Sequence, residues 1–153
     1  MNAMQSDQIF VRRMQKSDVK EVFRVGADIS EFQVTPDIGF WTQEQLLSWL
    51  TKEDDPLLVA ETDGEIIGFI LCQVHRQTGK ATVENIFVKD KYRRHHVGSA
   101  LLHDCLTKLE TIGVTFVCAL TSIDNSPVAS FWKQHGFQHG HEFTWFERSV
   151  KQS

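Results

Sequence analysis

The sequence predicts a mixed α/β fold, of the α/β or α+β class, with a mainly antiparallel sheet of about six or seven strands and about four helices. Three consecutive strand patterns joined by short turns form a meander, and helix and strand patterns alternate after it. The 153 residues are 41% hydrophobic and 24% charged, the composition of a globular chain with one core. We therefore expect a single domain over residues 1–153.

The first third of the chain predicts one strand and two helices. Ile9–Arg13 is rich in strand-forming residues. Ser17 or Asp18 then caps a helix that runs to about Val25. After an irregular stretch, Thr42–Gln45 forms a capping box, in which each of the two end side chains can bond the other's backbone N–H.

The middle of the chain predicts an antiparallel meander. Leu57–Thr62 and Glu65–His75 are strand patterns, and Asp63-Gly64 between them is a strong hairpin turn because glycine tolerates positive φ. Thr78–Lys80 turns the chain again into a third strand, Ala81–Val88.

The last third predicts two helices that alternate with strands. Gly98–Ile112 has one apolar stripe at helical spacing and ends at Gly113. Val114–Leu120 is a continuous apolar run, typical of a strand covered on both faces. Ser126 as N-cap, followed by proline, opens the final helix, and Phe143–Glu147 is the last expected strand.

A basic turn precedes the helix that begins near Gly98, and it is the most informative stretch of the sequence. The first N–H groups of a helix lack partners within the helix, and the helix dipole places partial positive charge there. Arg93 and Arg94 lie beside this end, together with His95 and His96. The arrangement suits a phosphate or pyrophosphate, although an ordinary strand–loop–helix connection with surface arginines explains it equally well.

The same stretch, Tyr92–Leu102, resembles the acetyl-CoA-binding signature of the GNAT superfamily of N-acetyltransferases, Arg/Gln-x-x-Gly-x-Gly/Ala. Arg93 matches the first position and Gly98 the last, while His96 replaces the middle glycine. Two more segments extend the resemblance to nearly the whole chain: the hairpin Asp63–Phe69, and the segment from Asn125 to Phe137.

The resemblance implies an N-acetyltransferase that transfers the acetyl group of acetyl-CoA directly to a primary amine. Acetyl-CoA is then a co-substrate, held in a gap where two strands splay apart. The residues implied to bind it are Ile86, Phe87, Val88, Arg93, Arg94, His95, His96, Val97, Gly98, Ser99 and Asn125. The alternative is a non-catalytic acyl-CoA-binding or sensing domain with the same fold.

The implied chemistry needs a base, because an alkylamine is protonated near neutral pH. Glu84 is the candidate, since strand alternation would place it on one face with Ile86 and Val88. A surface glutamate is the competing interpretation, and His75 is the reserve base. The Val88 N–H would polarise the thioester carbonyl. Trp132 stands where many members of the family have a tyrosine acid, and an indole is not a usable acid.

Acids and aromatic residues in Asp28–Trp41 suggest a cationic acceptor, since the resemblance places this segment at the acceptor pocket. A solvated loop with buried aromatic residues is the alternative. His135, His139 and His141 are interpreted as chance loop histidines, so no metal is expected.

The net charge of −4 argues against general nucleic-acid binding. No apolar run is long enough to span a membrane, and no signal peptide is visible at the start of the chain. Three cysteines in apolar contexts indicate reduced thiols and a cytoplasmic location. Homodimer formation stays open, as many members of the family are dimers.

Overall fold

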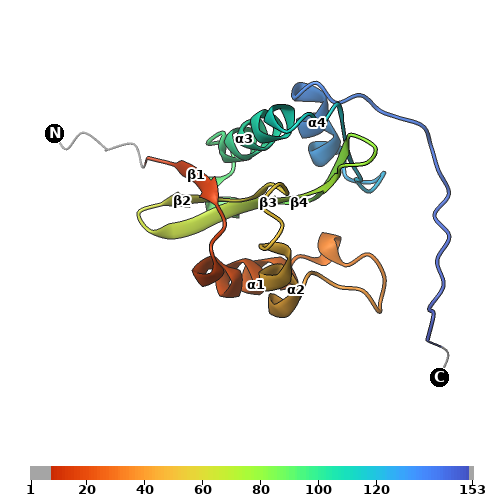
Figure 1. The fold of residues 1–153 in the computed structure, drawn as a ribbon, viewed down its shortest axis with the longest axis horizontal. Coiled ribbons are helices and arrows are strands. Elements are labelled where there is room, and N and C mark those ends of the chain that lie inside the picture. Colours follow the sequence, from red (N-terminus) through yellow and green to blue (C-terminus); the bar gives the residue numbers. More distant parts are fainter. Residues whose placement is uncertain (1–7, 152–153) are drawn as a thin grey trace. The chain divides into compact units, whose positions relative to one another are not determined.

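The computed structural model describes residues 8–151, which divide between Leu120 and Thr121 into two units. The first unit is built on a sheet of five strands in the order β1-β2-β3-β4-β5 (Figure 1). The first three neighbouring pairs are antiparallel, and β4 and β5 run parallel. The strands are β1 Phe10–Arg13, β2 Leu57–Thr62, β3 Glu65–His75, β4 Lys80–Val88 and β5 Phe116–Ala119.

Helices cover both faces of this sheet. In Figure 1, α1 (Val19–Ala27) and α2 (Gln43–Trp49) lie on one face, and α3 (Val97–Thr111) lies on the other. Short 3₁₀ turns join the elements: η1 is Lys16–Asp18, η2 is Ser30–Phe32 and η3 is Asp90–Tyr92. The second unit contains α4, Ser126–Gln134. The mixed α/β architecture with four helices is therefore confirmed for residues 8–151.

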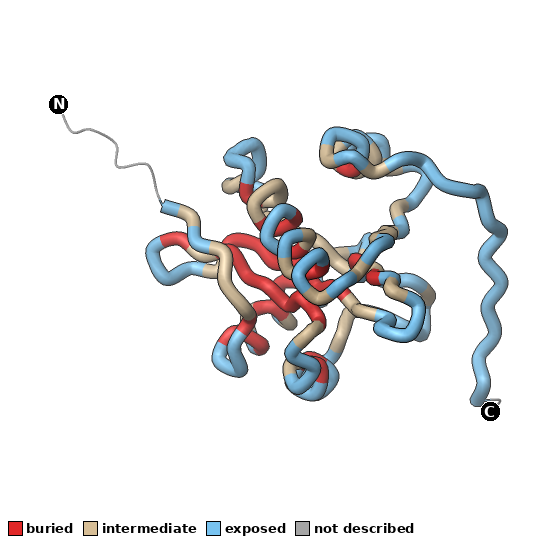
Figure 2. The backbone as a smooth tube through the Cα atoms, turned by 45° about the horizontal axis from the view of Figure 1, so that its top comes forward, coloured by how far each residue is buried: buried red, intermediate tan, exposed pale blue. Residues whose placement is uncertain are grey.

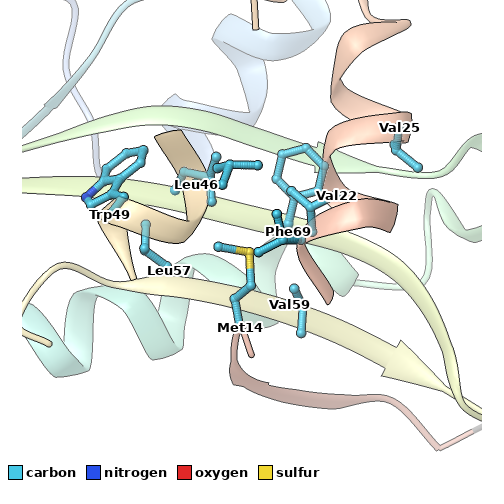
Figure 3. Close-up of a cluster of buried hydrophobic side chains, with 10 residues drawn as sticks. Met14, Val22, Val25, Leu46, Trp49, Leu57, Val59 and Phe69 are labelled. Carbon is cyan, nitrogen blue, oxygen red and sulfur yellow. The ribbon is translucent and has the colours of Figure 1, made fainter. Parts of the chain in front are cut away.

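The core lies between the sheet and the pair α1 and α2. Apolar side chains from both helices meet those of β2 and β3, as Figure 3 shows. The buried members are Met14, Val19, Val22, Val25, Leu46, Trp49, Leu57, Val59, Phe69 and Leu71. On the opposite face, α3 buries its own apolar stripe, which comprises Val97, Leu101, Leu102, Cys105 and Leu109. Both faces of the central strands are therefore covered (Figure 2).

The local signals of the sequence are largely confirmed. β2 and β3 have the expected bounds, and Asp63 and Gly64 between them both have positive φ. The Thr42 N–H donates to Gln45 Oε1 at 2.9 Å and the Gln45 N–H donates to Thr42 Oγ1 at 3.1 Å, so the capping box forms as expected.

Two boundaries differ from expectation. The N-cap of α4 is Asn125 rather than Ser126, because the Asn125 side chain accepts a bond from the Val128 N–H at 3.4 Å. β5 begins at Phe116 rather than Val114, because Gly113 is left-handed and the chain joins the sheet where the Thr115 N–H reaches the Gly79 carbonyl at 2.9 Å.

The expectation of six or seven strands is wrong for the described residues, which contain five. The missing strand is Phe143–Glu147, which adopts neither helix nor strand. Its aromatic side chains are exposed, as are the other residues from 138 to 151 (Figure 2). Strand propensity acts through pairing and packing, and this segment has neither in the described structure. No helix among residues 8–151 has the length and apolar character needed to cross a bilayer.

Candidate functional site

Strand β4 leaves its parallel partner halfway along its length. The pairing of β4 with β5 runs from Lys80 opposite Phe116 to Val83 opposite Ala119 and ends there. Residues 84–88 of β4 continue beside β3, without a β5 partner among the described residues. The sheet therefore offers an open strand edge five residues long.

The backbone groups at this edge can be assigned from the antiparallel ladder. The Lys89 N–H donates to the Ile67 carbonyl at 2.8 Å, so Lys89 faces β3. Backbone groups alternate in direction along a strand, and those of Phe87 therefore face β3 too. The N–H and C=O of Ile86 and Val88 face the open edge, where they can pair with an extended ligand.

Gly68 permits the close approach of β3 and β4 beside this edge. It lies opposite Val88, and a Cβ on Gly68 would lie 2.6 Å from the Phe87 carbonyl oxygen and 3.3 Å from a methyl carbon of Leu101. Backbone cannot yield as a flexible side chain can, so a side chain here would displace β4.

A β-bulge places Glu84 on this strand. Leu71 opposes Asn85 while Cys72 opposes Val83, so Glu84 is the extra residue of β4. The bulge interrupts the alternation, and Val83 takes the face of Ile86 and Val88. The simple alternation on which the expectation for Glu84 rests is interrupted at this bulge, so the alignment of Glu84 with Ile86 and Val88 stays a prediction.

The surroundings of Glu84 favour a proton acceptor. Neighbouring protein partly desolvates its carboxyl group and raises its pKa above the usual range, although the residue as a whole is exposed to solvent. The charge of His75, on β3, acts in the opposite direction. A carboxylate with a raised pKa is a stronger base than an ordinary glutamate, and water can still reach it.

The turn that follows β4 contains two left-handed residues. Arg94 has φ of +67°, and His96, the N-cap of α3, has φ of +61° and ψ of 20°. His96 directly precedes Val97, the first residue of a 15-residue helix, and a left-handed residue beside a right-handed one can turn neighbouring N–H groups toward an anion. The family signature has glycine at the position of His96, and the backbone here adopts the conformation that favours glycine.

The two arginines of the turn differ in their contacts. Arg93 Nε donates to the Val88 carbonyl at 3.2 Å, and its guanidinium pairs with Asp90 at 3.1 Å. No described residue bonds to the Arg94 guanidinium, which is exposed. His95 and His96 are exposed, Val97 is buried beneath the turn, and Gly98 and Ser99 are half-buried in the first turn of α3. The Arg94 guanidinium is therefore available to a ligand at this turn.

An ion-pair network that the sequence analysis missed fixes the start of this turn. Lys89 Nζ lies 3.3 Å from both Glu21 on α1 and Glu65 on β3, and the Tyr92 hydroxyl donates to Glu65 at 3.2 Å. The bidentate bond from Arg24 is the main cause that lowers the pKa of Glu21 to about 2. Partners 24 to 68 residues apart in sequence leave no local pattern that could reveal the network.

The segment Asp28–Trp41 divides between core and solvent. Phe32 and Phe40 stack at 5.6 Å, and both rings contact Phe69 of β3. The acidic side chains are exposed; they are Asp28, Glu31 and Asp37. Trp41 reaches β4 instead, where its indole N–H donates to Asn85 Oδ1 at 2.8 Å. The aromatic part of the segment therefore contacts the strand that carries Glu84.

In the second unit, two expected residues have local roles. Asn125 caps α4, and the Trp132 indole N–H donates to Thr121 Oγ1 at 3.0 Å while its ring contacts Phe131 and Phe137. Within residues 8–151, no cluster of three or more His, Cys, Asp or Glu side chains has a geometry that could hold a metal ion.

Comparison with known proteins gives consistent matches. A model of the acetyltransferase (GNAT) family matches residues 26–137. An uncharacterized N-acetyltransferase of Methanocaldococcus jannaschii is 27% identical over 109 residues, which are 67% of this chain and 48% of the relative, so the chain spans about half of that relative's length.

Solved structures share the fold. Ard1 of Thermoplasma volcanium is 25% identical with a TM-score of 0.72, over 87% of this chain and 84% of the other. The PaiA N-acetyltransferase of Thermoplasma acidophilum, in complex with coenzyme A, is 20% identical with a TM-score of 0.73, over 86% and 90%.

Proposed function

The chain belongs to the acetyltransferase (GNAT) family, and we propose that it transfers the acetyl group of acetyl-CoA directly to a primary amine. The observation that carries this proposal is the open edge of β4 beyond Val83, which leads directly into the left-handed turn at the start of α3. An extended arm and a phosphate group can be held side by side at these two features. The related fold of PaiA N-acetyltransferase in complex with coenzyme A supports the proposal.

Binding of acetyl-CoA uses backbone groups and the guanidinium of Arg94. The N–H and C=O of Ile86 pair with an amide group of the pantetheine arm as an additional strand would. The N–H groups of the turn and of the first turn of α3 bond to the pyrophosphate, and Arg94 adds charge. Arg93 already bonds to the Val88 carbonyl, which leaves the Val88 N–H for the thioester.

The proposed chemistry is one direct transfer, for which acetyl-CoA supplies the thioester. Val88 N–H donates to the thioester oxygen and stabilises the negative charge that develops there. Glu84 accepts one proton from the ammonium group of the acceptor. The freed nitrogen attacks the carbonyl carbon, so that a C–N bond forms and the C–S bond breaks. Water carries the second nitrogen proton to the thiolate, which needs little help because a thiol has a pKa near 8.5.

A turnover screen tests this function. Acetyl-CoA is incubated with the protein and a library of primary amines, while thiol release and acetylated product are measured together. We expect one acetylated amine for each thiol released. Binding of CoA without turnover would favour the non-catalytic acyl-CoA sensor, and the absence of CoA binding would contradict both functions. The proposed reaction needs no metal. The three cysteines form no disulfide with one another, which supports a reducing, cytoplasmic setting.

A further inference from the structure

A pocket of about 240 Å³ opens between α2 and the sheet on the face that carries the core helices. Its walls come from the end of the segment Asp28–Trp41, from α2 and the residues after it, and from β3. The lining residues are Trp41, Gln45, Ser48, Trp49, Lys52 and Gln73. None of the exposed acids Asp28, Glu31 and Asp37 contributes to this lining.

The two indole rings present carbon to this pocket. Trp41 and Trp49 lie with ring centroids 4.6 Å apart and planes tilted by 49°. Both indole N–H groups are already bonded, Trp41 to Asn85 at 2.8 Å and Trp49 to the buried Asp55 at 2.7 Å. The polar groups that remain in the pocket are neutral apart from the ammonium of Lys52. The lining therefore suits a flat apolar group and repels a second cation.

The pocket is tied to the bulge of β4 by the same side chains. Gln73 of β3 lies opposite Thr82, two residues before Glu84. Trp41 holds Asn85, the residue directly after Glu84. Trp41 therefore both lines the pocket and bonds to the side chain of the residue that follows the bulge.

We propose that this pocket receives the apolar end of the amine acceptor, and that Trp41 is a positioning residue that sets Glu84 through Asn85. The inference rests on the proposed acetyl transfer and names the class of acceptor: a primary amine with a flat apolar substituent. Such an acceptor differs from the cationic one that the acids of Asp28–Trp41 suggest.

An acceptor series tests the class of amine. Phenethylamine, butylamine and 1,4-diaminobutane share a primary amine and differ at the far end. We expect kcat/KM to fall in that order, with about a tenfold difference or more between the first amine and the last. The reason is that burial of an aromatic ring stabilises the bound acceptor enough to change kcat/KM by this factor. A series in which 1,4-diaminobutane is the best acceptor would overturn the inference, while the proposed acetyl transfer would stand.

Two variants separate pocket from positioning. Ser48→Phe fills the pocket, so KM for phenethylamine should rise about tenfold while kcat changes little. Leu47→Phe is the matched control, since it adds the same ring to an exposed position of α2 outside the pocket. Trp41→Phe keeps an aromatic wall and removes the N–H, so kcat should fall more than KM rises, by about tenfold or more if the base is displaced. Equal effects of Ser48→Phe and Leu47→Phe, or an unchanged kcat in Trp41→Phe, would contradict the proposal.

Binding can be measured without turnover. The indole N–H signals of Trp41 and Trp49, identified with the variants Trp41→Phe and Trp49→Phe, should shift in ¹⁵N NMR spectra when phenethylamine is added. They should shift much less in Ser48→Phe than in Leu47→Phe. Shifts in a protein that acetylates no amine would support the pocket and contradict the transfer. Acetylation with both signals unmoved would contradict the pocket alone.

Discussion

His96 has a left-handed backbone, and the substitution His96→Gly should relax it. An L-residue in this conformation costs about 1–2 kcal/mol, which glycine does not incur. Glycine also gains freedom in the unfolded chain, which destabilises the fold by about 0.4–1 kcal/mol. The net gain is between about zero and 1.5 kcal/mol. For a chain of this length it corresponds to a rise in Tm of up to about 6 °C, at about 2–4 °C per kcal/mol.

The neighbouring residue provides a matched control. His95 is an exposed histidine in the same turn, and its φ is not positive. In His95→Gly, glycine also gives the unfolded chain more conformational freedom, but no backbone strain is released in the folded state. The Tm of this variant should therefore fall by about 1–4 °C. The difference in stability between the two variants then measures the strain at His96 directly, and we expect about 1–2 kcal/mol.

Thermal unfolding by circular dichroism and calorimetric titration with CoA provide the two readouts. If the turn binds phosphate through its backbone, His96→Gly should bind CoA as tightly as the parent or more tightly. Equal Tm values for His96→Gly and His95→Gly would refute the strain argument. A tenfold loss of CoA affinity in His96→Gly alone would show that the imidazole itself is a ligand.

Three more substitutions test the site. Glu84→Gln should lower kcat by about 10²–10⁴-fold with CoA affinity intact, and higher pH should partly rescue it by supplying free amine. In the parent enzyme, kcat should fall as pH drops through the raised pKa of Glu84, since only the carboxylate accepts a proton. A parent kcat that does not depend on pH would exclude Glu84 as the base. So would a kcat of Glu84→Gln within twofold of the parent value. Arg94→Glu should weaken CoA binding about tenfold or more by calorimetry, because a charge-assisted bond contributes roughly 1.5–3 kcal/mol, and unchanged affinity would remove Arg94 from the site. Gly68→Ala should destabilise the fold by about 1–3 kcal/mol in urea unfolding, whereas Gly39→Ala, with open space around it, should not; similar losses in both would contradict the close approach.

Elements defined by local chemistry could be predicted from the sequence. The bounds of β2 and β3 follow from their patterns and from the turn at Asp63-Gly64, and the cap of α2 follows from Thr42 and Gln45. The basic turn before α3 could be placed in the same way. These features depend on residues close together in the chain, so their physics is visible in the sequence.

Features defined by long-range pairing could not be predicted. The bulge at Glu84 exists because β3 and β4 change register there, and no composition signal marks it. The bond from Trp41 to Asn85 joins residues 44 positions apart. The strand expected at Phe143–Glu147 has suitable residues, but strand formation requires a paired neighbour that the described structure does not provide.

The central claim is that acetyl-CoA lies along the open edge of β4, and backbone amide exchange measures this directly. The Val88 N–H faces the open edge, and the neighbouring Phe87 N–H faces β3 and serves as an internal control. We predict that acetyl-CoA slows hydrogen exchange at Val88 by at least tenfold and leaves exchange at Phe87 nearly unchanged, as expected when a ligand takes the free N–H. Unchanged exchange at Val88 under saturating acetyl-CoA would contradict the account.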